Sequence, residues 1–390
     1  MTRILRWLLL LFMGMLGLQC TGLVSLNMPA PATIDEEEAW LMLGRNLQHQ
    51  HYASRNVAPP LQVAWEKGVK SVVVDHPLAV GDYIFAPTRN GQLSIIDYTT
   101  GMRVGAGKLA PALAHVPTIH DNVLIAGTNL GEKTLIFFDL RQALKVLQAR
   151  YPHVTTSPVV WNDRIFFGTE KGLFFCANEG TGKEVWRYET GAPIHSSPAL
   201  LAPAVVFGND KGWVHALDAT SGVLLWKRQL EGNIFSHPVL DDSSVYIGTT
   251  ARKFYALRLR DGQTRWSRTV SGAIFGSPSL YKNTLYLGTN GHEVIAFNRE
   301  NGEVIWKFQT KGIVNTVPLA SPDYVYVTCW DRNLYVLNRY SGKLVFQQPL
   351  KRPPKSSPII YRDFILVHVS NDELVAFANE KIVQARREEK

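Results

Sequence analysis

Five acidic or imidazole side chains stand at similar places in a repeating pattern, one to three residues before a proline. They are Asp75, His76, His115, His195 and His237. Imidazole and carboxylate ligands that meet around one point can bind zinc or copper. These five belong to separate repeats and lack a local ligand spacing, so hydrogen-bonded or solvated histidines are the favoured interpretation. We predict no metal site, and treat the five as candidates for the mouth of a central channel.

Motifs for other chemistry are missing from the chain. It has no Gly-rich phosphate loop and no nucleophile motif. The composition is that of an ordinary globular protein, with 46% hydrophobic and 19% charged residues and a net charge of +8. The densest basic clusters, at 351–355 and 386–387, lack the interleaved aromatic residues of a nucleic-acid surface. We therefore predict no catalytic residue and no nucleic-acid partner.

The segments that carry the candidate residues belong to a 40-residue repeat with three markers in one register. A glycine is followed four residues later by an aromatic residue, and a proline recurs at the same interval. The glycines are Gly182, Gly222, Gly262, Gly302 and Gly342, and the aromatic residues are Trp186, Trp226, Trp266, Trp306 and Phe346. The prolines are Pro77, Pro117, Pro158, Pro198, Pro238, Pro278, Pro318 and Pro358, with one extra residue between the second and third. The pattern indicates eight copies.

Each repeat holds three or four short β segments separated by turns. In the fourth repeat these are 198–201, 204–208, 213–218 and 223–228, with Gly212 and Gly222 in the turns. Four strands in about 40 residues are typical of a propeller blade. We predict an all-β, eight-bladed propeller of four-stranded blades, in which the strand after each proline lines the central channel.

The two ends of the repeat array predict how the ring closes. The last repeat lacks a Trp strand, and such a strand stands before the first repeat at 61–66. Trp65 lies twelve residues before Pro77, the spacing that separates Trp226 from Pro238. The N-terminal strand is therefore expected to complete the last blade, which removes an exposed sheet edge. The predicted propeller spans 61–378 and is followed by a charged tail, 379–390.

The first residues resemble an export signal. A basic start precedes the apolar run 7–18, which is short for a spanning helix. Cys20 follows at the place of the lipid-acceptor cysteine of bacterial lipoproteins, although Gln19 departs from that pattern. Cleavage near 30–32 and an uncleaved anchor are the competing interpretations. We predict a signal at 1–20 and a linker and lead-in at 21–60. The other cysteines, Cys176 and Cys329, are expected to be structural thiols.

The run from Ala216 to Trp226 carries a family resemblance. Ala, Asp, Gly and Trp stand at its places one, three, seven and eleven, as in the tryptophan-docking repeat of quinoprotein-like propellers. The resemblance covers about 61–378 and implies that the repeat tryptophans, with Trp65, pack between blades as structural residues. It places Cys176 where a small buried Ala is usual. Gly105 and Leu147 take the Trp place in the irregular first and second copies.

The resemblance leaves more than one function open. Quinone-dependent dehydrogenases of this type hold a quinone and a calcium ion in the channel, but only Asp75 is acidic there and their adjacent cysteine pair is absent. We therefore predict no cofactor. An exported ring of eight such blades also resembles the propeller lipoproteins of the outer-membrane β-barrel assembly machinery. That implies a non-catalytic scaffold, monomeric within a complex, on the periplasmic side of the envelope. A scaffold of another envelope complex is the remaining alternative.

Overall fold

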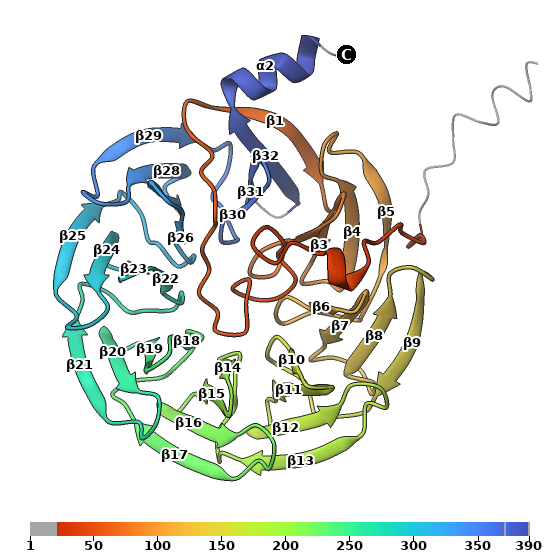
Figure 1. Cartoon of the computed structure of the whole chain (residues 1–390), viewed down its shortest axis with the longest axis vertical. Helices are drawn as coiled ribbons and strands as arrows, with labels where there is room; N and C mark the ends of the chain where they lie inside the picture. The colour runs from red at the N-terminus through yellow and green to blue at the C-terminus, as the bar shows by residue number, and fades with distance from the viewer. Residues whose placement is uncertain (1–21, 370–371, 389–390) are drawn as a thin grey trace, which may run out of the picture.

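A computed structural model describes residues 22–369 and 372–388. It contains eight four-stranded antiparallel sheets arranged as the blades of a ring, viewed down the ring axis in Figure 1. The predicted fold class, an all-β propeller of eight four-stranded blades, is confirmed. The expected export signal and Cys20 lie outside the described residues. No helix in the described part of the chain combines the length and the apolar character needed to cross a bilayer.

In blades 1 to 7 the strands follow chain order from the centre outward. Blades 1 to 4 consist of β2 (Leu78–Val80), β3 (Tyr83–Pro87), β4 (Gln92–Asp97) and β5 (Arg103–Lys108); β6 (Thr118–His120), β7 (Val123–Gly127), β8 (Leu135–Asp139) and β9 (Leu144–Ala149); β10 (Val159–Trp161), β11 (Arg164–Gly168), β12 (Leu173–Asn178) and β13 (Glu184–Glu189); and β14 (Ala199–Leu201), β15 (Ala204–Gly208), β16 (Trp213–Asp218) and β17 (Leu224–Gln229).

Blades 5 to 7 repeat this arrangement, and in blade 8 the N-terminal strand takes the outer place. They consist of β18 (Val239–Leu240), β19 (Ser244–Gly248), β20 (Lys253–Arg258) and β21 (Thr264–Thr269); β22 (Ser279–Tyr281), β23 (Thr284–Thr289), β24 (Glu293–Asn298) and β25 (Val304–Gln309); β26 (Leu319–Ala320), β27 (Tyr324–Cys329), β28 (Asn333–Asn338) and β29 (Leu344–Pro349); and β30 (Ile359–Tyr361), β31 (Phe364–Val369), β32 (Glu373–Asn379) and β1 (Leu61–Gly68). A short 3₁₀ turn, η1 (Pro31–Thr33), and a terminal helix, α2 (Glu380–Glu388), complete the elements.

The turn before each outer strand shows why the repeat needs its polar residue and its glycine. In blade 4 the Asp218 carboxylate accepts the N–H groups of Thr220 and Ser221 at 3.1 and 2.8 Å. Gly222 then turns the chain with φ +73°, a conformation that side chains with a Cβ rarely adopt. Its N–H bonds back to the Asp218 carbonyl at 2.8 Å. The turn aims the next strand, β17, along the outer edge of the blade.

The tryptophans pack between blades, as the repeat predicts. The indole of Trp226, in blade 4, lies against Gly262 of blade 5, where an added Cβ would come within 2.4 Å of the ring. Its Nε1 donates to the Leu259 carbonyl at 2.6 Å. The same pair of contacts recurs 40 residues apart along the ring, in Trp186–Gly222, Trp266–Gly302 and Trp306–Gly342. Glycine is thus required by close approach as well as by φ.

The ring closes between its N- and C-terminal ends. β1 pairs antiparallel with β32 from Leu61 opposite Asn379 to Gly68 opposite Glu373. Trp65 of β1 then lies against Gly101 of blade 1, and its Nε1 donates to the Tyr98 carbonyl at 3.0 Å. The joint between the last and first blades therefore uses the same contacts as the four joints between neighbouring blades from blade 3 to blade 7.

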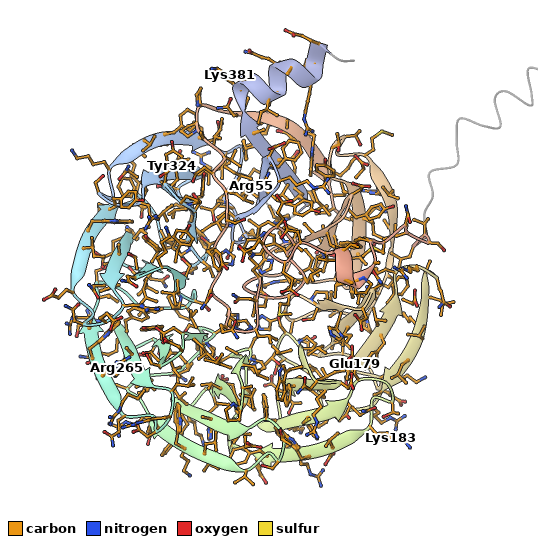
Figure 2. The ribbon with its side chains drawn as sticks, viewed as in Figure 1. Arg55, Glu179, Lys183, Arg265, Tyr324 and Lys381 are labelled. Atoms are coloured by element: carbon orange, nitrogen blue, oxygen red, sulfur yellow. The ribbon has the colours of Figure 1, made fainter. Side chains whose placement is uncertain are left out.

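In the irregular blades other side chains fill the space that the indole occupies in regular blades. In blade 2, Leu147 takes the place, 3.1 Å from a Cβ built on Gly182. In blade 1, Gly105 leaves a gap that Val24 fills, and the Ala106 N–H bonds to the Gly22 carbonyl at 3.2 Å. Side chains fill the spaces between blades throughout the ring, while Lys183 and Arg265 lie at its perimeter (Figure 2).

The C-terminal segment and the thiols complete the fold. The predicted charged tail is largely a short helix, α2, because Val383 is buried in the core of blade 8 beside Leu61. Cys176 and Cys329 are free and buried, as expected of structural thiols. Burial raises the pKa of each thiol to about 11, so both are protonated at neutral pH.

Candidate functional site

The segment expected as a linker and lead-in enters the centre of the ring, where Figure 1 shows it looping between the innermost strands. We refer to residues 40–53 as the lead-in segment. Its backbone bonds to the inner strands of six blades, which have a free edge toward the channel, and the Trp40 indole bonds to the inner strand of a seventh. The contacts are Trp40 N–Ala79 O, Ile119 N–Leu41 O, Leu200 N–Leu47 O, Leu240 N–Gln48 O, Leu280 N–Gln50 O, Ala53 N–Ala320 O and Trp40 Nε1–Ile360 O, all between 2.7 and 3.0 Å. Part of the predicted linker is therefore integral to the ring.

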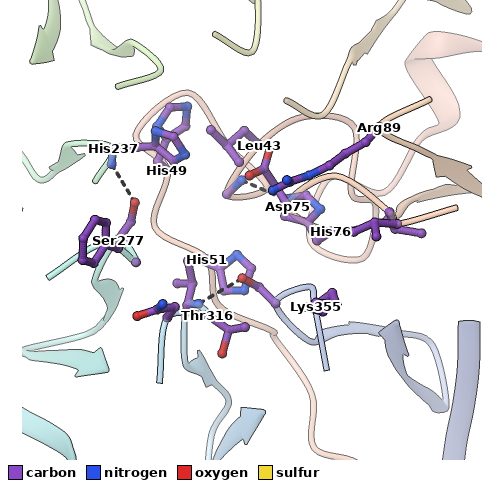
Figure 3. Close-up of a pocket in the computed structure, with 18 of the residues that line it drawn as sticks. Leu43, His49, His51, Asp75, His76, Arg89, His237, Ser277, Thr316 and Lys355 are labelled. Carbon is purple, nitrogen blue, oxygen red and sulfur yellow. Dashed lines mark hydrogen bonds between the residues drawn. The ribbon is translucent and has the colours of Figure 1, made fainter. Parts of the chain in front are cut away.

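A cavity of about 440 Å³ lies beside the lead-in segment. The lead-in segment contributes Leu43, Gly44, His49 and His51 to its wall. The propeller contributes Val72, Val73, Asp75, His76, Arg89, His237, Phe275, Gly276, Ser277, Asn315, Thr316, Val317, Trp330, Lys355 and Ser357. Figure 3 shows the loop of the lead-in segment carrying His49 and His51 into the space between blade 1 and blades 5 to 8.

Asp75 and His115 form a pair between blades 1 and 2. Asp75 Oδ2 lies 3.0 Å from His115 Nδ1 and accepts the Val116 N–H at 2.9 Å. Burial acts to raise the pKa of Asp75, but His115, His237 and the two hydrogen bonds together hold it below its ordinary range. Asp75 is therefore ionised at neutral pH. With φ +47°, its backbone takes a conformation that aspartate adopts more readily than most residues.

His237 belongs to a belt of hydrogen bonds between neighbouring blades. Its Nδ1 accepts the Ser197 N–H at 2.9 Å, and its own N–H donates to Ser277 Oγ at 2.7 Å. Ser157 and Val317 donate in the same way to the serines 40 residues further along. Burial and the neighbouring His115 lower the pKa of His237 to about 3, so the ring is neutral. One of its roles is therefore to hold blades 4, 5 and 6 together.

His51 and His76 are held by backbone groups. His76 Nδ1 donates to the Pro77 carbonyl at 2.9 Å, and its Nε2 accepts the Gly44 N–H at 3.1 Å. His51 Nε2 contacts the Pro358 carbonyl at 3.1 Å. Burial lowers the pKa of both rings. The Trp40 indole meets both edge-on, at centroid distances of 5.0 and 5.4 Å. These two histidines fasten the lead-in segment to the ring.

His195 does not join the channel group. Its Nδ1 lies 2.9 Å from Asp210 and its Nε2 lies 3.1 Å from Glu170. Hydrogen bonding to Asp210 is the main cause that raises its pKa. The structure thus brings together Asp75, His76, His115 and His237 of the five predicted candidates, and holds His195 in an ion-pair group between blades 3 and 4.

His49 is the member of the site that the repeat could not reveal, because it precedes the first repeat. Its ring is buried, and among the described residues neither ring nitrogen has a hydrogen-bond partner. Burial and His237 lower its pKa to about 3, against the opposite effect of the nearby Pro238 carbonyl. The ring centroids of His49 and His237 are 6.2 Å apart. The alternation of His49 and His51 around a polar residue in the lead-in segment was the only signal.

Two cations and two aromatic rings line the same cavity. Within residues 22–369 and 372–388, neither Arg89 nor Lys355 forms an ion pair. Lys355 Nζ lies 4.9 Å from the centre of the Trp330 ring, and both Trp330 and Phe275 are more than 40% exposed. Cations beside exposed rings favour a planar, negatively charged guest.

Comparison with known proteins points to one sequence family and to two kinds of solved structure. The family model described as "Outer membrane protein assembly factor BamB" matches residues 141–232 and 210–387. The structure of BamB from Moraxella catarrhalis is similar with a TM-score of 0.68 and 20% identity, covering 82% of this chain and 99% of that chain. No curated protein sequence matches significantly.

Two dehydrogenases share the fold as well. The quinohemoprotein alcohol dehydrogenase ADHIIG from Pseudomonas putida HK5 is similar with a TM-score of 0.78 and 12% identity, covering 90% of this chain and 83% of that one. A europium-containing methanol dehydrogenase gives 0.77 and 12%, with coverages of 88% and 98%. At these identities the structural likenesses show the propeller fold alone.

Proposed function

Since the chain belongs to the family of the outer membrane protein assembly factor BamB, we propose that it is a non-catalytic scaffold that binds proteins of the cell envelope during outer-membrane protein assembly. The proposal places the propeller on the periplasmic side, as one copy within a larger complex. The observation that carries it is a row of exposed apolar side chains on the perimeter of the ring.

The outer strands of five blades present this row. The side chains are 36–48% exposed and stand just before the Trp place of each repeat; they are Leu144 and Val146 on β9, Val185 on β13, Leu224 and Leu225 on β17, Val304 and Ile305 on β25, and Leu344 and Val345 on β29. Exposed apolar side chains that recur at one place on a surface can mark interaction sites on soluble proteins. We call these five strands the open rim.

The open rim also offers backbone hydrogen bonds. Each of its strands ends a four-stranded sheet, so one edge of its N–H and C=O groups has no strand beside it. An extended segment of another protein can add to such an edge, with alternate side chains resting on the apolar residues. Blade 5 differs, because β21 carries Thr264 and Arg265 where β17 carries Leu224 and Leu225. This binding mode suits partners that present unpaired strands.

Affinity purification of the tagged protein from membranes tests the proposal. Components of the outer-membrane assembly machinery are expected to co-purify with the unaltered protein. Leu224→Glu should reduce their recovery, because it places a charge on the open rim. Thr264→Glu, the same change 40 residues further on at an already polar place, is the matched control. Recovery of a different envelope complex instead, unaffected by Leu224→Glu, would overturn both the role and the surface.

Attachment to the membrane forms a separate part of the proposal. We propose that Cys20 receives a lipid anchor that holds the propeller at the outer membrane. Metabolic labelling with a fatty-acid analogue, followed by separation of the two membranes, is expected to show labelled protein in the outer-membrane fraction. Cys20→Ser should abolish the label and release the protein. Equal labelling of the variant would exclude Cys20 as the acceptor.

A quinone-dependent dehydrogenase is the second candidate, favoured by Arg89, Lys355 and Trp330 in the cavity. A quinone would supply the electron acceptor, and these side chains suit a planar anion. The accompanying hard cation fits poorly, because calcium and its relatives take six to eight oxygen ligands. Asp75 is the only carboxylate on the described cavity wall, which is too few for that coordination. Reconstitution with pyrroloquinoline quinone and calcium, followed by dye reduction with alcohols, tests this candidate; turnover would favour it over the scaffold.

A further inference from the structure

The imidazoles at the centre of the ring form a donor set different from that of a hard-cation site. One ligand atom from each of Asp75, His115 and His237 lies within 4.8 Å of the other two. The rings of His115 and His237 meet edge to face at a centroid distance of 5.2 Å. His49 approaches His237 from the lead-in segment. Two imidazoles and one carboxylate thus converge from blades 1, 2 and 5, and the His49 ring lies beside His237 on the lead-in segment.

His49 is the independent sign that something binds here. A neutral imidazole has one N–H donor and one lone pair, and burying both without partners is unfavourable. The ring is only 3% exposed, and both nitrogens lack a partner among the described residues. By contrast, ring nitrogens of His51 and His76, which also lie in the centre of the ring, bond to backbone groups. A bound ion would satisfy the lone pair that the fold leaves open on His49.

We propose that Asp75, His115, His237 and His49 bind a divalent transition-metal ion of the zinc class. Zinc takes four ligands, and imidazole nitrogens with a carboxylate oxygen are a donor set it accepts at 2.0–2.2 Å. A separation of up to 4.8 Å between ligand atoms exceeds that of a closed tetrahedral site, so the side chains must draw together by roughly an ångström when the ion binds. Neutral imidazole is the form of histidine that binds metals.

The contacts already present constrain how each ligand takes part. His237 Nδ1 is engaged by the Ser197 N–H, which leaves Nε2 as its ligand atom. The Ser197 contact selects the tautomer with its proton on Nε2, so binding of the ion through Nε2 requires that proton to move to Nδ1 and the bond from the Ser197 N–H to be released. Asp75 Oδ2 and His115 Nδ1 face each other, so the ion would take the place of the proton between them, that proton would move to Nε2, and Asp75 would keep its bond from the Val116 N–H. The ion would join the lead-in segment to the channel wall through His49.

Titration of the metal-free, full-length protein with zinc chloride in a calorimeter tests the proposal. One equivalent is expected to bind, and excess calcium chloride should not compete. His49→Phe should weaken zinc binding by at least roughly 10–100-fold, the range typical for loss of an outer-shell partner. This variant is decisive because no short hydrogen bond ties the His49 ring to the fold, whereas His237 also holds blades together. His195→Ala, which removes a histidine with two carboxylate neighbours outside the site, should leave affinity unchanged.

Two controls make the outcome unambiguous. The thermal midpoint of His49→Phe without zinc shows whether the fold is intact, and His115→Gln provides a second variant with a smaller change in shape. With cobalt chloride as the probe, the visible absorption of a tetrahedral ion should appear in the unaltered protein and be lost in both variants. Absence of zinc binding, or binding that survives His49→Phe and His115→Gln but not His195→Ala, would overturn the site. Neither result bears on the open rim, so the scaffold proposal stands or falls separately.

Discussion

The perimeter and the centre of this ring follow different physical rules. On the perimeter, one contact set of indole, glycine and carbonyl repeats every 40 residues and joins each regular blade to the next. In the centre, a single-copy segment pairs with inner strands and brings histidines with different partners together. The contrast teaches that repetition accounts for the fold, while the features able to bind something specific lie where repetition ends or leaves an edge open.

The largest expected effect on stability comes from removing β1 and the lead-in segment together. Deleting residues before Val69 removes β1, the Trp65 joint and the backbone bonds of the lead-in segment. We expect loss of the cooperative unfolding transition, measured by circular dichroism during heating. Deleting 380–388, the α2 residues that rest on blade 8, is the comparison and should lower the midpoint only slightly. A truncated ring with an unchanged midpoint would show that closure contributes little.

A single perimeter joint should be the next most costly to break. Trp226→Ala removes a buried indole and leaves a cavity against Gly262, at a cost of about 3–5 kcal/mol in the free energy of unfolding. Trp226→Phe keeps an aromatic ring but loses the bond from Nε1 to Leu259, so it should cost less. Denaturant unfolding of both variants measures the difference. Equal and small costs would contradict a structural role for this tryptophan.

Acid should destabilise the fold through His49 at the centre of the ring. The pKa of His49 is about 3 in the folded protein and about 6.5 in an unfolded chain, so the unfolded state binds more protons between these values. Its contribution to stability is complete above about pH 6.5 and is lost as pH falls toward 3, by at most about 1.4 kcal/mol per pH unit. Denaturant unfolding of metal-free protein at several pH values, with His49→Phe as the comparison, measures this slope. An identical slope in the variant would remove His49 from the explanation.

The smallest effect on stability is expected at the open rim. Leu224 is already 36% exposed, so Leu224→Glu should change the free energy of unfolding by no more than about 0.5 kcal/mol. Thermal unfolding beside Thr264→Glu measures this. A large destabilisation would mean that the apolar residues of the open rim stabilise the fold. Their exposure would then no longer support a role in binding partners.

How far the sequence predicted each region follows from the same contrast. Eight copies of one pattern average out local irregularity, so the blade count, the strand order and the tryptophan joints could be read from spacing. The path of 40–53 has no second copy, and it depends on inner-strand N–H groups that only the folded ring presents. His76 shows the limit of prediction from spacing, since its hydrogen-bond partner Gly44 lies 32 residues away in the lead-in segment. The sequence placed Asp75, His115 and His237 at the channel, but it could not add His49 or set His195 apart.

Site-specific photo-crosslinking tests most directly whether the perimeter, and not the centre, carries the scaffold role. A photoreactive amino acid would be placed at Leu224 on the open rim and, in a second protein, at the equivalent Thr264 on the polar β21. Illumination of intact cells should join the first protein to components of outer-membrane assembly, and should give little adduct from the second. Absence of adducts at Leu224, or equal adducts at both positions, would contradict the account.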